Sequence, residues 1–173
     1  MNGLVTVLRA ADAAARWHVD QRRKGAAQEP YVGHVLEVAM LVAEATDGAD
    51  PNLIVAALLH DTIEDQGVTP EEIAARFNDD VAALVVEVTD DKMLPKAERK
   101  WLQIKHAPKL TPRGKILKLA DKISNLRSLA TSPPADWPMQ RRIDCDLDNG
   151  SCAGSQRSVR PTRTGIRSGY GEC

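Results

Sequence analysis

One stretch of the chain combines an imidazole with three carboxylates within six residues, His60-Asp61-Thr62-Ile63-Glu64-Asp65. It follows an apolar run, residues 53–59, and a helix start made of Asp50 as N-cap and Pro51 as first helical residue. We therefore expect one helix through the whole stretch, with Glu64 one turn after His60 and Asp65 one turn after Asp61. Such a face repels itself unless a cation covers it, and imidazole with carboxylate suits Mn, Fe, Zn or Mg. The alternative is an ordinary helix end whose acids are solvated.

Two further expected helices each contribute a residue of the same kind. A helix over residues 31–45 places His34 on its buried side. A second helix, beginning at Thr111 and Pro112, places Asp121 beside its apolar stripe. That stripe is expected to comprise Ile116, Leu119, Ala120, Ile123 and Leu126. Each residue also has a simpler interpretation, because a core histidine is commonly satisfied by a neighbour and Asp121 can pair with Lys118 or Lys122.

Two imidazoles and two carboxylates converging in a helical core would hold a divalent ion with open positions for water. The four candidate ligands are His34, His60, Asp61 and Asp121. Such an ion lowers the pKa of its bound water from about 15.7 to about 7 in favourable sites. Glu64 and Asp65, one turn beyond two of the ligands, are placed to orient that water or to carry its proton.

Cationic residues in two segments are the available partners for an anionic substrate. They are Arg22, Arg23, Lys24, Lys92, Lys96 and Arg99. The simpler interpretation of the first segment is the basic C-terminal turn of a helix, and that of the second is a solvated surface. Hydrolysis of a phosphate ester or phosphoanhydride is the reaction class that uses acids, cations and a metal ion together.

The composition bounds the fold and excludes several classes of function. A chain of 173 residues with 43% hydrophobic but only 3% aromatic residues favours an all-α single domain. A net charge of −1 gives no field for nucleic acid or a membrane surface, and we expect neither as a partner. The apolar run at residues 4–8 is too short for a signal peptide or a membrane span, which favours a cytoplasmic protein. The three cysteines match neither a disulfide framework nor a zinc motif.

Helical periodicity divides the chain into an ordered region and a tail. Helices are expected over 6–23, 31–45, 51–65, 70–77, 79–88 and 96–106, and from residue 112 onward. After about residue 138 the chain is rich in Arg, Gly and Ser, and no helical or strand period persists. We therefore predict a metal-dependent hydrolase domain over residues 1–137 and a divergent, poorly ordered tail over 138–173.

Five motifs, in order, resemble those of the HD-type hydrolase domain of the RelA/SpoT family. They are Gln21-Arg22-Arg23-Lys24-Gly25, Pro30-Tyr31-Val32-Gly33-His34, the His60–Asp65 stretch, residues 87–100, and Leu119-Ala120-Asp121-Lys122-Ile123-Ser124-Asn125-Leu126-Arg127. The resemblance is strongest to the small stand-alone guanosine-3′,5′-bis(diphosphate) 3′-pyrophosphohydrolases, including the animal SpoT homologue. It implies an all-helical HD fold and Mn²⁺-dependent removal of pyrophosphate from the ribose 3′ position of ppGpp or pppGpp, giving GDP or GTP. Another divalent ion would satisfy the same ligands.

The resemblance also implies a role for each candidate residue. His34, His60, Asp61 and Asp121 would be the metal ligands, and Glu64 with Asp65 would act on the attacking water. The segment Arg22-Arg23-Lys24 would lie against guanine and ribose. Lys92, Lys96 and Arg99 would meet phosphates, and Asn125 would contact the ribose.

Other functions stay open at this point. Removal of the 2′-phosphate of NADPH, or hydrolysis of another nucleotide, would use the same site. The chain also departs from the family after Trp137, where small members continue with an aromatic helix and this chain reads Cys145-Asp146-Leu147-Asp148. A non-catalytic protein that binds metal or nucleotide is therefore a third interpretation. The oligomeric state is not determined by these patterns.

Overall fold

Side-chain caps start four helices of the computed structural model, which describes residues 3–134. The backbone N–H groups of the first turn donate to Asp50, Thr69, Asn78 and Thr111, at 2.9 to 3.2 Å. Proline follows three of these caps, where its missing N–H costs nothing. The helices are α1 Gly3–Trp17, α2 Val32–Ala45, α3 Pro51–Leu59, α4 Thr62–Gln66, α5 Pro70–Arg76, α6 Asp79–Val88, α7 Lys96–His106 and α8 Pro112–Thr131, with a 3-10 turn at Ala107–Lys109. Residues 3–134 contain no strand, which confirms the all-α prediction.

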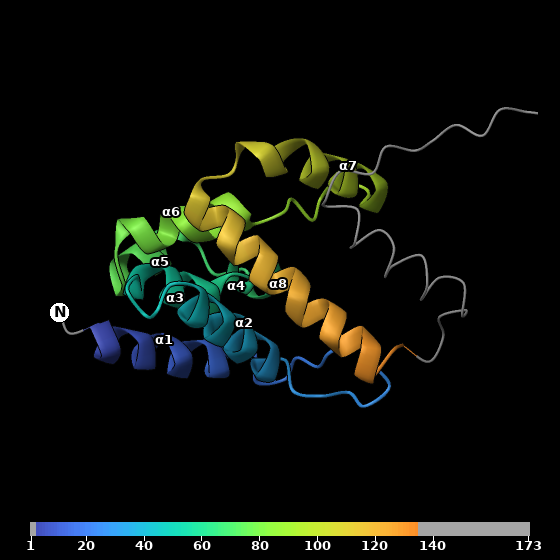
Figure 1. Ribbon diagram of the computed structural model, residues 1–173, viewed down its shortest axis with the longest axis horizontal. Helices are drawn as coiled ribbons and strands as arrows, with labels where there is room; N and C mark the ends of the chain where they lie inside the picture. The colour runs from blue at the N-terminus through green and yellow to red at the C-terminus, as the bar shows by residue number, and fades with distance from the viewer. Residues whose placement is uncertain (1–2, 135–173) are drawn as a thin grey trace, which may run out of the picture.

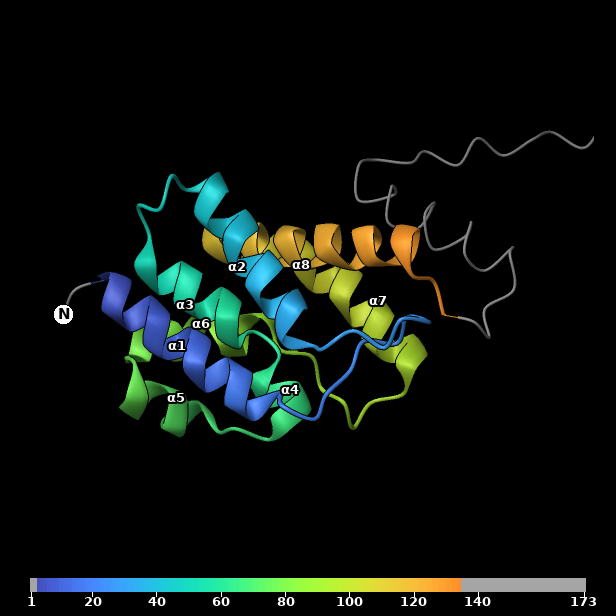
Figure 2. The ribbon, with the colours of Figure 1, turned by 90° about the horizontal axis from the view of Figure 1, so that it is seen from below.

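Helix α3 is the centre of the packing. All residues from Leu53 to Leu59 are buried, and α3 contacts α1, α2, α6 and α8. Helices α1 and α8 lie on opposite sides of α3 (Figures 1 and 2). Because the apolar run is covered on every side, the polar residues that follow it emerge inside the helix bundle.

Two predicted helices end earlier than expected. The first stops at Trp17, and residues 18–30 form a loop in which Arg22 and Pro30 make an isolated bridge. The predicted 51–65 helix is broken at His60 and Asp61 into α3 and α4. Near the break, His60 Nδ1 bonds to Ala57 O and Thr62 Oγ1 donates to Leu59 O, so side chains satisfy carbonyls that the last turn of α3 leaves free.

The buried stripe of α8 also differs from the prediction. Leu117, Ala120 and Ser124 face the core, whereas Leu119 is 56% exposed and Ile123 41% exposed. Asp121 shares the buried side with Leu117, since the two are one turn apart. The true stripe therefore directs Asp121 inward.

Some of the predictions concern residues that lie outside the part of the chain that the structure describes. The boundary at residue 137, the tail over 138–173 and the three cysteines lie outside the described residues. Among residues 3–134, no helix has both the length and the apolar character needed to cross a membrane.

Candidate metal centre

Four polar side chains from three parts of the fold converge beside the end of α3. His34 comes from α2, His60 and Asp61 from the break between α3 and α4, and Asp121 from α8. His60 Nε2 lies 3.0 Å from Asp61 Oδ2 and 3.8 Å from Asp121 Oδ1. His34 Nε2 lies 3.4 Å from Asp121 Oδ1 and 3.7 Å from Asp61 Oδ2. All four predicted ligands therefore surround one point.

Hydrogen bonds on the far side of each imidazole determine which nitrogen can bind a cation at that point. His60 Nδ1 lies 2.8 Å from Ala57 O, and a carbonyl only accepts, so Nδ1 carries the proton. His34 Nδ1 lies 2.8 Å from Ser124 Oγ. The Ser124 hydroxyl donates to Glu37 Oε2 at 2.6 Å, so it accepts from His34 Nδ1. With Nδ1 protonated in each ring, Nε2 is the nitrogen that faces the carboxylates and can bind a cation when it carries no proton.

These two nitrogens make the site fit a divalent cation. Both His34 and His60 are buried, and neither Nε2 makes a hydrogen bond. His34, His60 and Asp121 can each offer one ligand atom, with all three atoms within 4.8 Å of one another. The two carboxylates that face these nitrogens need positive charge beside them. The chemistry of the donors is that of a divalent metal site.

The contacts of His34 and Asp121 favour the metal-ligand interpretation over the simpler ones. Ser124 satisfies Nδ1 of His34, but the buried Nε2 makes no hydrogen bond, so this histidine is only half satisfied by its neighbours. Lys118 Nζ lies 3.7 Å from Asp90 Oδ2, and within residues 3–134 neither Lys118 nor Lys122 forms an ion pair with Asp121. Asp121 accepts instead from Asn125 Nδ2 at 2.6 Å.

The charges of the site shift the pKa values of its own members. Burial disfavours the charged form of His60, but Asp61 and Asp121 outweigh it and raise its pKa to about 9. Burial likewise opposes ionisation of Asp61, whereas His60 and His34 hold the pKa of Asp61 well below its usual range. In the metal-free protein a proton on His60 thus supplies the positive charge that the acids require.

The two predicted catalytic acids lie on α4 and are paired with cations. Lys92 donates to Asp65, and its Nζ lies 3.9 Å from Glu64 Oε1. Arg99 from α7 lies 3.7 Å from Glu64. Burial, with Asp61 as the next cause, raises the pKa of Glu64 above its usual range. Lys96 is exposed on the first turn of α7.

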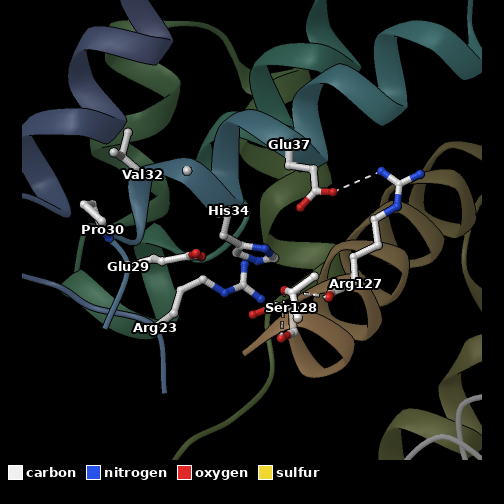
Figure 3. A pocket seen from close by; sticks show the side chains of 10 residues that line it. Arg23, Glu29, Pro30, Val32, His34, Glu37, Arg127 and Ser128 are labelled. Carbon is white, nitrogen blue, oxygen red and sulfur yellow. Dashed lines mark hydrogen bonds and ion pairs between the residues drawn. The ribbon is translucent and has the colours of Figure 1, made fainter. Parts of the chain in front are cut away.

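A pocket of about 570 Å³ opens beside His34, between the 22–30 loop and the last turns of α8 (Figure 3). Arg23 lines it and donates to Asn125 Oδ1 at 3.0 Å, so two predicted substrate residues meet across 102 positions of sequence. Glu37 and Arg127 form an ion pair of 3.0 Å in its wall. Arg22 instead donates to the carbonyls of Val19 and Gln21, and Lys24 is exposed.

Several residues of the site were not singled out from the sequence. Tyr31 donates to Asp61, and burial together with Asp61 raises the pKa of its hydroxyl. Glu37 and Ser124 orient His34, and Gln21 donates to Asp65 at 2.6 Å. Tyr31, Ser124 and Gln21 lie inside the motifs quoted from the sequence, and this membership was the only sequence signal that they belong to the site. Glu37 carried none.

A model of a known family, described as HD domain, matches residues 10–145. The chain belongs to this family. Relatives named guanosine-3′,5′-bis(diphosphate) 3′-pyrophosphohydrolase MESH1 are 48% identical in Xenopus tropicalis and 47% identical in Homo sapiens. Each match covers 78% of this chain and 75% of the relative. A solved structure described as a metazoan ortholog of SpoT that hydrolyses ppGpp is also similar to this chain, with a TM-score of 0.76 and 41% identity over 83% of this chain and 84% of that one.

Proposed function

We propose that this chain is a metal-dependent guanosine-3′,5′-bis(diphosphate) 3′-pyrophosphohydrolase, which converts ppGpp or pppGpp to GDP or GTP and pyrophosphate. The observation that carries the proposal is the pair of buried Nε2 atoms of His34 and His60, which make no hydrogen bond and face Asp61 and Asp121. Relatives that bear this activity in their names match three quarters of their own length to this chain.

His34, His60, Asp61 and Asp121 are the proposed ligands. Mn²⁺ is the proposed ion because the family resemblance implies it, and the imidazole and carboxylate donors are compatible with it. When bound, the ion would act as a Lewis acid that makes a water molecule nucleophilic at neutral pH. Ser124 and Ala57 O keep both imidazoles in the tautomer that presents Nε2 to the site. Tyr31 holds Asp61 by a hydrogen bond to Oδ2.

The remaining residues of the site have proposed roles toward water and substrate. The water oxygen attacks the phosphorus that is attached to the ribose 3′ oxygen; that P–O bond breaks, and the 3′ oxygen takes up a proton. Glu64 with Asp65 orients the water and accepts its proton. The substrate contacts proposed are Lys92, Lys96 and Arg99 at the phosphates, Asn125 at the ribose, and Arg22, Arg23 and Lys24 at the guanosine side.

We assign residues 1–137 to the hydrolase domain and 138–173 to a tail, and we place the enzyme in the cytoplasm. The proposed reaction does not depend on the domain boundaries or on the location of the enzyme. The substrate of the proposed reaction is a small nucleotide, so neither a nucleic acid nor a membrane takes part in it.

The test is a substrate panel with the purified full-length chain, stripped of metal and then given Mn²⁺, Mg²⁺ or Zn²⁺. Release of pyrophosphate and GDP from ppGpp with Mn²⁺, lost in Asp61→Ala, is the expected result. NADPH and deoxynucleoside triphosphates complete the panel. Cleavage of one of these nucleotides with ppGpp left intact would refute the substrate assignment. Binding of metal or nucleotide without any turnover would refute the proposal that this chain is an enzyme.

A further inference from the structure

Gln21 connects the loop after α1 to the acidic helix α4. Its side-chain Nε2 donates to Asp65 Oδ2 at 2.6 Å, across 44 positions of sequence. Nothing in the roles proposed above uses Gln21. Its contact with Asp65 is nevertheless short, and a hydrogen bond to a charged acceptor is stronger than one between neutral groups.

The amide of Gln21 has only one possible orientation. A carboxylate only accepts, so the NH₂ group must face Asp65 and Oε1 must face the other way. There Oε1 lies 2.6 Å from His18 Nδ1 and accepts from Gln66 Nε2 at 2.5 Å. His18 is 1% exposed, so this backing cannot be exchanged for water. Two donors from behind thus lock Gln21 onto Asp65.

The backbone of Gln21 is held as firmly as its side chain. Its carbonyl accepts from the N–H of Tyr31 at 3.0 Å. The ring of His18 lies 5.2 Å from that of Tyr31, whose hydroxyl donates to Asp61. One loop therefore positions a predicted metal ligand and a predicted catalytic acid together.

The second oxygen of Asp65 accepts from Lys92. A lysine ammonium has three N–H donors, and the Lys92 side chain is 46% exposed, so donors remain for an anion. Each carboxylate oxygen has two lone-pair sites, so Asp65 anchors this cation and can still accept a hydrogen bond from the attacking water.

We propose that Gln21 is a positioning residue: backed by His18 and Gln66, it fixes Asp65 so that Asp65 holds Lys92 toward the phosphates of the substrate. This inference deepens the proposed function and, for the phosphate contact, rests on it. Gln21 itself touches neither the reacting atoms nor the proposed ligands by its side chain.

The kinetic test is a double-mutant cycle with ppGpp and Mn²⁺. Gln21→Met keeps the length of the side chain but removes its amide, and we expect KM to rise roughly tenfold, about the effect of one hydrogen bond to a charged group. Lys92→Met should raise KM at least as much. If Gln21 acts through Lys92, the double variant is no worse than Lys92→Met alone, because interacting residues are non-additive. Multiplicative effects on KM would overturn the proposal.

A control variant separates positioning from simple loss of stability. Asn52→Ala removes a comparable bond from an amide to a carboxylate, Asn52 Nδ2 to Asp80 Oδ2 at 2.8 Å, at the start of α3. Like Gln21→Met, it also removes a bond that the amide oxygen accepts, here from Asn78 Nδ2 at 3.2 Å. We expect it to lower thermal stability without changing KM. An equal rise of KM in Asn52→Ala would assign the effect of Gln21 to stability and overturn the proposal.

A substrate-free measurement keeps this inference distinct from the proposed function. In ¹⁵N NMR spectra, the Lys92 ammonium bound to Asp65 should exchange slowly with water, and Gln21→Met should speed that exchange roughly tenfold. An unchanged Lys92 signal would overturn the positioning role even in an active enzyme. If ppGpp is not cleaved at all, the proposed activity fails, and this spectrum still decides whether Gln21 fixes Asp65 and Lys92.

Discussion

Ser124 Oγ lies 2.8 Å from His34 Nδ1, although 90 positions separate the two residues in sequence. The hydroxyl gives its own proton to Glu37, so it can only accept from the imidazole. This contact on the far side of the ring therefore keeps a proton on Nδ1, so the Nε2 atom that faces Asp61 and Asp121 can bind a cation through its lone pair.

Replacing Ser124 with alanine should therefore weaken metal binding without removing a ligand. Loss of an outer hydrogen-bond partner of a metal-binding histidine commonly costs about 10–100-fold in affinity, and we expect a loss in this range. Titration calorimetry of the metal-free protein with Mn²⁺ measures it. Ser128→Ala, one turn further along the same helix, is the matched control and should keep the affinity. Equal affinities in the two variants would show that Ser124 does not orient His34.

The affinity for metal should rise with pH up to about 9. In the metal-free protein, Asp61 and Asp121 overcome the effect of burial and raise the pKa of His60 to about 9, and the cation must displace that proton. The apparent Kd for Mn²⁺ should fall about tenfold for each pH unit between roughly 7 and 9, as expected for release of one proton. Calorimetry in buffers of different ionisation enthalpy counts the protons released. Metal binding without proton release in this range would contradict the charge balance described for the site.

The same proton should stabilise the metal-free fold on the acid side. The folded pKa of His60 lies above the ordinary value of 6.5, so its stabilising contribution is complete below about pH 6.5 and is lost as pH rises through about 9. Urea unfolding of metal-free protein across this range should show the decline. In His60→Gln the slope attributable to this group should disappear. An identical slope in this variant would assign the pH dependence to other groups.

Tyr31 should resist ionisation in the folded, metal-free protein. Burial disfavours its phenolate, and the negative charges of Asp61, Asp65 and Asp121 add to the effect, so its pKa lies well above the usual 10. The difference between the ultraviolet titrations of wild type and Tyr31→Phe should show no phenolate from Tyr31 below about pH 11. A phenolate that forms near pH 10 would place Tyr31 away from the acids.

Gly25 should not tolerate a side chain. A Cβ there would lie 2.3 Å from Ser132 O and 2.6 Å from Ser132 Oγ, at the end of α8. We expect Gly25→Ala to lower the free energy of unfolding by about 1–3 kcal/mol, the usual cost of overpacking. Gly33→Ala is the control, since a Cβ at Gly33 meets nothing within 4 Å and alanine favours a helix. Comparable stability of the two variants would show that the 18–30 loop does not pack against Ser132 as described.

The sequence by itself determined the helical class, several helix starts and the candidate ligands. A cap such as Asp50 and the proline after it act on the next turn of backbone, so their effect is readable locally. The four candidate ligands were identifiable because imidazole and carboxylate side chains placed next to apolar runs need a partner. The five motifs, read in their order along the chain, identified the resemblance to the RelA/SpoT family.

Only the tertiary structure decided how those residues meet. The orientation of His34 and the bond from Gln21 to Asp65 depend on partners that are distant in sequence. The helix breaks at His60 and Asp61, where side chains take over hydrogen bonds to carbonyls of the last turn of α3. The stripe of α8 was misassigned for the same reason, because which face is buried depends on where α2, α3 and α6 pack against it. Local periodicity places a residue on a helix, whereas the partner that orients its side chain is set by contacts between distant segments.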